Sequence, residues 1–180
     1  ARWLFGVPAD QIEVLIHPQS IIHALVYYSD GSVIAQASLP DMRTPIAYSL
    51  AWPARLKADF KRLDLAAAGH LTFDEPDPAR FPALRITKES LQAGGAAPTI
   101  LNAANEVAVE AFLNRSTSFP GIAALVERTL SKAASELSGV VPDSLEAVMY
   151  LDSRAREIAK TALLEQTGAF TGPSAYSVPI

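Results

Sequence analysis

Two prolines bracket a short polar turn, Pro40 to Pro45, which reads PDMRTP and follows a predicted strand. Because each proline fixes its own backbone, the turn should be a rigid elbow at a strand end, where binding and catalytic residues often lie. Met42 is one of only two methionines in the chain, and its adaptable thioether suits contact with a ligand. The structural alternative is an elbow between sheet and helix in which Asp41 and Arg43 bond locally.

The three histidines are the next groups that could do chemistry. His17 closes one predicted strand, and His23 shares a strand face with Ile21 and Leu25. A zinc site needs three or four ligands, and the sequence has neither a cysteine nor a pair of histidines four residues apart. We therefore expect His17 and His23 to be partly buried structural residues rather than metal ligands.

Three further motifs are weaker candidates. Three carboxylates within FDEPDPARFP could bind a metal, but neighbouring carboxylates between prolines are more typical of a solvated loop. A glycine pair before a helix could cradle phosphate, yet a helix C-cap explains it better. Polar residues inside the apolar helix LNAANE should join a helical domain to a sheet domain. The three carboxylates are Asp74, Glu75 and Asp77, and the glycine pair is Gly94 and Gly95. The polar residues of LNAANE are Asn102, Asn105 and Glu106.

Composition restricts the partners and the compartment. The formal net charge is -4, and the fifteen lysines and arginines are scattered, which argues against a nucleic-acid partner because neutralising phosphates needs a basic face. No apolar run approaches the roughly 20 residues that span a bilayer. The absence of cysteine excludes disulfides and fits a reducing compartment, which predicts a cytoplasmic protein without a nucleic-acid or membrane partner.

The elements that position the elbow are read from turn signals and periodicity. Asp30-Gly31 is a strong hairpin signal, and it joins strands predicted at Ile21 to Ser29 and Ser32 to Leu39. A further strand is predicted at Ile12 to His17, ended by Pro18 because proline donates no ladder hydrogen bond. A sheet usually has about five or six strands. Because only three are predicted here, a missing segment, a second subunit or both should complete the sheet.

Helical periodicity begins near residue 81 and predicts four amphipathic helices. The first spans Phe81 to Ala93, and the second opens near Pro98. Ser118 should cap the third, and Asp143 with Glu146 should form a capping box for the fourth. Short connections between such helices favour an antiparallel bundle.

The predicted fold class is therefore α+β. Part of a sheet domain, with a hairpin plus one further strand, precedes an all-α four-helix bundle. The predicted boundaries place the end of the sheet domain at 1–53, a linker at 54–78, the bundle at 79–166 and a flexible tail at 167–180.

The segment His17 to Pro53, HPQSIIHALVYYSDGSVIAQASLPDMRTPIAYSLAWP, closely resembles the 1-deoxy-D-xylulose 5-phosphate reductoisomerase family. LNAANEVAVEAFL and DSRAREIA continue the resemblance over nearly the whole chain. It implies an NADPH-dependent oxidoreductase that uses Mg²⁺ or Mn²⁺ and converts this phosphorylated sugar to 2-C-methyl-D-erythritol 4-phosphate in isoprenoid precursor synthesis. It also implies a homodimer formed through the sheet domain.

The resemblance assigns roles to a few residues. Pro40 and Met42 match residues beside the substrate and the nicotinamide, so they are expected to line the site without reacting. His23 matches a histidine implicated in activity, and it is expected to support the site indirectly. The family's three acidic metal ligands and its nucleotide-binding motif do not map onto this chain. No catalytic residue and no metal ligand is therefore predicted within it.

The opening residues ARWLFG read as the last turn of a helix ending at Gly6, so we expect the chain to be a piece of a longer protein. Such a piece alone is predicted to lack reductoisomerase activity and to supply dimerisation, an active-site wall and a scaffold. The alternative is a non-catalytic dimerisation or binding module that shares the family's scaffold.

Overall fold

A computed structural model describes residues 1–57, 59–137 and 139–168 of the chain. The chain forms two compact units. The hairpin unit comprises Glu13–Pro76, and the helical unit comprises Ala1–Ile12 together with the chain from Asp77 onward. The first twelve residues thus pack with the helices, and the predicted linker is largely part of the hairpin unit. The predicted flexible tail, 167–180, falls almost wholly outside the described residues.

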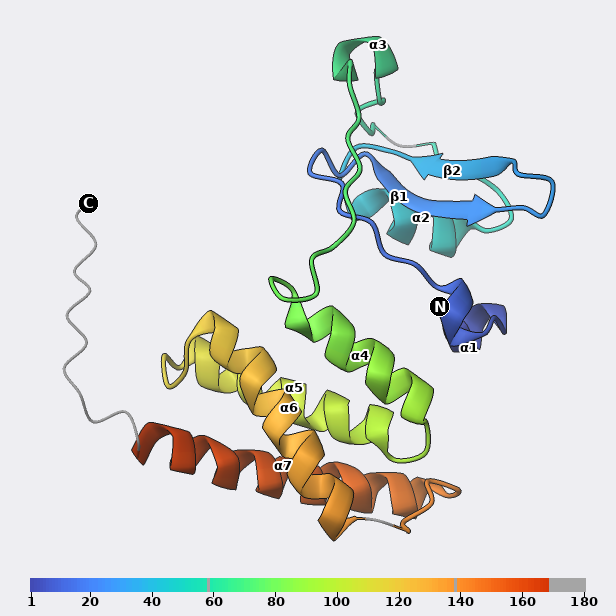
Figure 1. Ribbon diagram of the computed structural model, residues 1–180. Helices are drawn as coiled ribbons and strands as arrows, with labels where there is room; N and C mark the ends of the chain where they lie inside the picture. The colour runs from blue at the N-terminus through green and yellow to red at the C-terminus, as the bar shows by residue number, and fades with distance from the viewer. Residues whose placement is uncertain (58, 138, 169–180) are drawn as a thin grey trace, which may run out of the picture. The chain divides into compact units, whose positions relative to one another are not determined.

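The predicted hairpin forms the sheet of the first unit (Figure 1). Strand β1, Ile22–Tyr27, pairs antiparallel with β2, Val33–Ala37. At the turn, the Asp30 side chain accepts from the Ser32 backbone N–H at 2.9 Å, and Gly31 has a φ of 85°. This is the left-handed region that glycine adopts without strain, so the Asp-Gly signal is confirmed in its mechanism.

The further strand predicted at Ile12 to His17 does not form. Ile16 makes one isolated antiparallel bridge with Asp74, with N–H to carbonyl distances of 2.8 and 2.9 Å in the two directions. Among the described residues, no other strand borders this segment. Because Pro18 follows closely and cannot donate, the pairing stops after one bridge.

Two short helices complete the hairpin unit. Helix α2, Arg43–Ala51, starts within the elbow, and α3 is Leu65–Ala68. Asp64 caps α3, because its carboxylate accepts from the backbone N–H groups of Ala66 and Ala67 at 2.9 and 3.0 Å. The segment predicted as a plain connection therefore contains a capped helical turn.

The helical unit begins with two short elements, α1, Arg2–Phe5, and the 3₁₀ helix η1, Ala9–Gln11. Gly6 ends α1 in the left-handed conformation, with a φ of 65°, as the sequence predicts. The Arg2 guanidinium donates to the Leu91 carbonyl at 3.1 Å, which ties this end of the chain to the long helices.

The four predicted helices are present as α4, Pro82–Ala93, α5, Ala97–Leu113, α6, Phe119–Glu136, and α7, Leu145–Gly168 (Figure 1). Their packing confirms the predicted α+β class, with a small sheet followed by a helical domain. No helix among the described residues is long and apolar enough to cross a membrane.

Helix starts follow from capping serines. Ser118 Oγ accepts from the Gly121 N–H at 3.2 Å, as predicted for the third helix. At α7, Ser144 Oγ accepts from the Ala147 N–H at 3.1 Å, so the cap is Ser144 and the predicted cap at Asp143 is wrong by one residue. The reason is geometric, since Ser144 directly precedes the first helical residue.

Alanine lets the long helices approach closely. Helix α5 contributes to two neighbouring hydrophobic clusters, one shared with α4, α6 and α7 and the other mainly with α6 and α7. Their fully buried alanines are Ala103, Ala104, Ala108, Ala133, Ala155, Ala159 and Ala162. Small side chains on facing helices shorten the distance between helix axes, and the larger Leu125 and Leu151 fill the remaining space.

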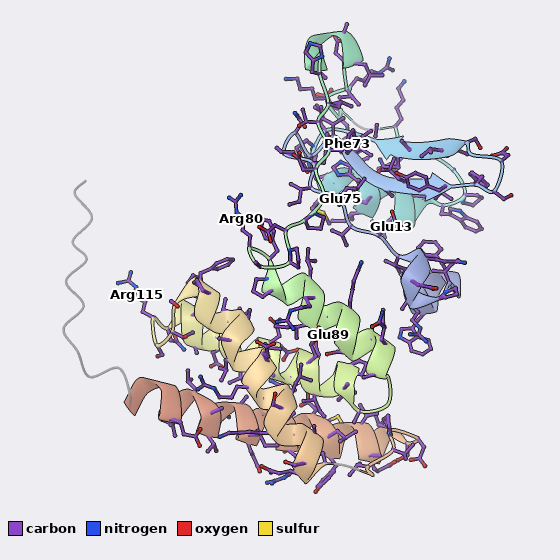
Figure 2. The ribbon with its side chains drawn as sticks, viewed as in Figure 1. Glu13, Phe73, Glu75, Arg80, Glu89 and Arg115 are labelled. Carbon is purple, nitrogen blue, oxygen red and sulfur yellow. The ribbon has the colours of Figure 1, made fainter. Side chains whose placement is uncertain are left out.

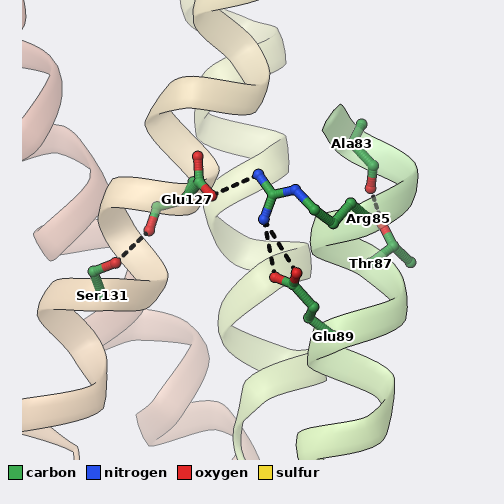
Figure 3. A network of polar contacts seen from close by, with 6 residues as sticks. All are labelled: Ala83, Arg85, Thr87, Glu89, Glu127 and Ser131. Carbon is green, nitrogen blue, oxygen red and sulfur yellow. Dashed lines mark hydrogen bonds and ion pairs between the residues drawn. The ribbon is translucent and has the colours of Figure 1, made fainter. Parts of the chain in front are cut away.

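An exposed polar network joins α4 to α6 (Figure 3). The Arg85 guanidinium donates to Glu89 on its own helix at 3.1 and 3.2 Å and to Glu127 on α6 at 2.7 Å. These hydrogen bonds raise the pKa of Arg85, with Glu127 the largest contributor. Because all three side chains are accessible to water, the network contributes little to stability.

We expect Ser118→Ala to lower the free energy of unfolding by about 1 kcal/mol, because one N–H at the start of α6 loses its acceptor. Urea unfolding of the chain measures this change. Ser131→Ala on the same helix is the matched control, since Ser131 Oγ only donates to the Glu127 carbonyl at 3.0 Å in an exposed turn. Equal losses in the two variants would contradict the capping role.

Candidate functional site: the elbow after strand β2

The elbow between β2 and α2 presents the predicted lining residues to solvent. Pro40 is exposed, and Met42 is 72% exposed at the residue that precedes α2. The helix begins here because the Thr44 N–H donates to the Asp41 carbonyl at 3.1 Å and the Ile46 N–H donates to the Met42 carbonyl at 3.3 Å. Both predicted residues are therefore accessible to a ligand within this unit.

Asp41 and Arg43 form a compact ion pair across Met42. Asp41 Oδ1 accepts from the Arg43 backbone N–H at 3.0 Å, and Arg43 Nε lies 3.0 Å from both carboxylate oxygens. Arg43 Nη2 donates to Oδ2 at 2.6 Å. These bonds lower the pKa of Asp41, with the side-chain hydrogen bonds from Arg43 as the largest cause.

A second contact connects Arg43 to a later part of the hairpin unit. The guanidinium carbon lies 5.8 Å from the centre of the Phe60 ring, within the range of a cation–π interaction. A second contact of this kind involves Tyr48, on the same helix as Arg43. The Arg55 guanidinium carbon lies 4.1 Å from the centre of the Tyr48 ring. Two arginines thus fasten α2 to the chain that follows it.

His23 lies at an irregularity in β1. The strand register shifts between Ile22 and Ala24, so the pairing skips His23. Its side chain is exposed, which departs from the partly buried position expected from the sequence. An exposed ring at a strand bulge is available to a partner outside the hairpin unit, and bulges often redirect side chains near active sites.

His17 contacts two residues that follow much later in the chain, Thr72 and Phe73. Its Nδ1 lies 2.8 Å from the Thr72 carbonyl oxygen, and its ring stacks on Phe73 with centres 4.5 Å apart (Phe73 is labelled in Figure 2). Because a carbonyl only accepts, Nδ1 is the donor in this hydrogen bond. Gln19 also bonds Thr72, with its Nε2 2.9 Å from the hydroxyl, so this group fastens the returning chain to the hairpin.

Two of the polar residues of LNAANE, Asn102 and Glu106, find partners inside the helical unit. Asn102 donates to Glu106 at 3.0 Å, and the Arg156 guanidinium on α7 donates to Glu106 at 2.6 Å. Arg156 also pairs with Asp152, 2.7 Å away. These bonds raise the pKa of Arg156, mainly through Asp152, and lower that of Glu106, mainly through Arg156. The motif thus joins α5 to α7, and the predicted join to the sheet domain stays a prediction.

The carboxylates around residue 75 do not assemble a metal site. Asp77 accepts from the Ala79 N–H at 2.8 Å and the Arg80 N–H at 3.3 Å, and the Asp74 backbone pairs with Ile16. Within the part of the chain that the structure describes, no three His, Cys, Asp or Glu side chains are grouped to hold an ion. The described carboxylates around residue 75 therefore do not form a metal site by themselves.

Reductoisomerases that bind a nicotinamide cofactor share this fold. A solved structure of 1-deoxy-D-xylulose 5-phosphate reductoisomerase from Zymomonas mobilis in complex with NADPH matches with a TM-score of 0.81 and 45% identity, covering 91% of this chain and 42% of that one. DOX-P reductoisomerase in complex with NADPH, fosmidomycin and magnesium matches with a TM-score of 0.81 and 40% identity, covering 92% and 42%.

Curated relatives agree with the structures. The 1-deoxy-D-xylulose 5-phosphate reductoisomerases of Afipia carboxidovorans and Cupriavidus pinatubonensis are each 54% identical to this chain, covering 90% and 93% of it. The family model described as DXP reductoisomerase C-terminal domain matches residues 37–158. The chain therefore belongs to the DXP reductoisomerase C-terminal domain family, which confirms the resemblance. It spans 40% and 41% of the length of these two relatives.

Proposed function

We propose that the chain is part of an NADPH- and divalent-metal-dependent reductoisomerase that converts 1-deoxy-D-xylulose 5-phosphate to 2-C-methyl-D-erythritol 4-phosphate in the cytoplasm. The observation that carries this proposal is the 54% identity to named reductoisomerases across nine tenths of the chain. The solved relatives with NADPH, fosmidomycin and magnesium support the same cofactors and a phosphorylated substrate.

In this proposal the elbow forms one wall of the active site. Pro40 and Met42 contact the substrate and the nicotinamide without reacting. The exposed thioether of Met42 adapts to a ligand surface, and an apolar wall excludes water from the path of the transferred hydride. NADPH would supply the hydride, and Mg²⁺ or Mn²⁺ would polarise the substrate oxygens. Residues outside this chain would hold most of both groups.

The hairpin unit is proposed to mediate homodimer formation. Large apolar side chains of both strands are exposed, including Val26, Tyr27, Val33 and Ile34. All five residues of β2 are exposed as well. An uncovered apolar sheet with unpaired edges needs another polypeptide to cover it. The missing part of the protein and a second subunit are the proposed covers.

His23 is proposed to support the site indirectly. Its exposed ring at the strand bulge can donate to, or accept from, a group that touches the substrate. It has no role as a metal ligand in this proposal, because no grouped ligands accompany it within the described residues. The helical unit acts as the scaffold.

The decisive experiment compares two purified proteins in an assay of NADPH oxidation with 1-deoxy-D-xylulose 5-phosphate and Mg²⁺. We expect the full-length protein that carries this chain to turn over and residues 1–180 alone to show no activity above background. Turnover by the isolated chain would refute the assignment of the metal ligands to another segment. A silent full-length protein would refute the enzyme proposal and favour a non-catalytic dimerisation or binding module, for which self-association without turnover is the signature.

A further inference from the structure

Hydrogen bonds between Asp41 and Arg43 link the two residues on either side of Met42 in the elbow. The bonds between Asp41 and Arg43 close a ring over the single residue between them, Met42. One bond goes to the Arg43 backbone, so the ring constrains main-chain dihedrals as well as side chains. Hydrogen bonds thus bridge the residues on both sides of Met42, while Met42 itself stays 72% exposed.

The same ring is anchored outside the elbow. Arg43 lies over the half-buried Phe60, and the Asp41 N–H donates to the Leu39 carbonyl at 2.8 Å. One end of the ring is therefore bonded to Leu39, two residues after β2, and the other end contacts the chain after α2. Met42 is presented from a frame with two independent attachments.

We propose that Asp41 and Arg43 are positioning residues for Met42, and we call their ion pair the Asp41–Arg43 brace. This role rests on the proposed function, in which Met42 touches the substrate or the nicotinamide. The brace holds the Met42 backbone in one conformation before the ligand arrives. Ligand binding then does not have to order the elbow, which is the advantage of a preorganised site.

Because the Asp41–Arg43 pair is exposed, its proposed positioning role can be measured separately from any effect on global stability. The Arg43 side chain is 70% exposed and that of Asp41 is 29% exposed, and exposed ion pairs contribute little to global stability. Loss of the brace should therefore leave the melting temperature nearly unchanged. Its effect should appear in local backbone order and in catalysis.

The pH dependence of the brace follows from the lowered pKa of Asp41, whose ordinary value is 3.8. A carboxyl with a lowered pKa in the folded state gives a contribution that is fully present above the ordinary pKa and is lost as pH falls through the lowered one. Arg43 and the Arg43 backbone N–H are the groups that face this carboxylate. The brace is therefore intact at neutral pH and opens only in acid.

The test uses the full-length protein with Asp41→Ala, Asp41→Asn and Arg43→Lys. Asp41→Asn keeps an oxygen for the Arg43 backbone N–H but removes the charge, whereas Asp41→Ala removes both. Asp30→Ala is the matched control, because Asp30 accepts from the Ser32 N–H at 2.9 Å and the Ser32 hydroxyl at 2.6 Å in another surface turn. Hydrogen exchange of the elbow, kcat and KM, and thermal unfolding are measured for each.

We expect Asp41→Ala to speed exchange of the Arg43 amide and to lower kcat/KM about tenfold, as expected for a misplaced contact residue. Asp41→Asn and Arg43→Lys should give smaller losses. Asp30→Ala should change neither the elbow nor kcat/KM. A double-mutant cycle with Met42→Ala then tests whether Asp41 acts through Met42. In the Met42→Ala protein, adding Asp41→Ala should lower kcat/KM by less than about twofold.

Each outcome decides a separate point. Unchanged amide exchange in Asp41→Ala would overturn the brace, and so would losses of activity that simply add to those of Met42→Ala. A fall in kcat/KM that tracks the melting temperature would reduce the pair to a stabilising contact and would also overturn the role. Absence of turnover in the unmodified protein would instead refute the proposed function, which the exchange data alone cannot do.

Discussion

Leu151→Ala is expected to lower the free energy of unfolding by about 3 kcal/mol, the middle of the range for a fully buried leucine. Leu151 lies on α7 with no accessible surface, packed among residues of α5 and α6 that include Ile100 and Ala103. Truncation leaves a cavity that alanine neighbours cannot fill, because their side chains are too short to move into it. Denaturant unfolding of the chain, monitored by helical circular dichroism, measures the loss.

Leu145→Ala on the same helix is the matched control. Leu145 is 72% exposed, so the same chemical change removes almost no buried contact, and the expected effect stays within about 0.5 kcal/mol. Similar losses for the two variants would mean that α7 is not packed as the structure shows.

Signals that act over a few residues predict the elements well. Asp30-Gly31 fixes the hairpin because its turn bonds close between neighbours, and Gly6 and Gly94 end helices with positive φ values of 65° and 64°. Ser118 caps α6 for the same local reason. The error at α7, where Ser144 replaces Asp143, arises because serine and aspartate are almost equally good caps and sequence spacing alone does not rank them.

Contacts between distant residues are what the sequence hides. The bond of His17 to the Thr72 carbonyl joins groups 55 residues apart, and a histidine ending a strand gives no signal of that partner. The strand predicted at Ile12 to His17 also depends on a distant partner, because within the described residues Ile16 forms a single bridge, with Asp74. In LNAANE the polar character indicated a partner, but only the fold identifies Arg156 on α7.

The candidate site likewise has features that the local sequence predicts and features that it does not. Two prolines around PDMRTP predicted a rigid elbow, because proline restricts the chain locally. The local pairing of Asp41 and Arg43 was one of the two interpretations left open, and the structure shows this pairing. What Pro40 and Met42 contact is not encoded near them, because in the proposed enzyme their ligands bind to another part of the protein.

Ala133→Leu is the second variant with a large expected effect, a loss of about 2 kcal/mol from overpacking. Ala133 on α6 is fully buried in the cluster that contains Leu137 and Leu151. Three added carbon atoms must either force neighbouring side chains from their rotamers or push α6 away from α5 and α7. Leucine is nearly as good a helix former as alanine, so the loss reports packing and not helix propensity.

Ala134→Leu, the adjacent residue on the same helix, makes the comparison decisive. Ala134 is exposed, so leucine there should leave the free energy of unfolding within about 0.5 kcal/mol of the parent. In the full-length protein, at temperatures where Ala133→Leu remains folded, the KM for substrate should be unchanged, because the proposed wall at Met42 belongs to the hairpin unit. A raised KM with little loss of stability would show instead that the helical unit shapes the site, and the scaffold role proposed for it would fall.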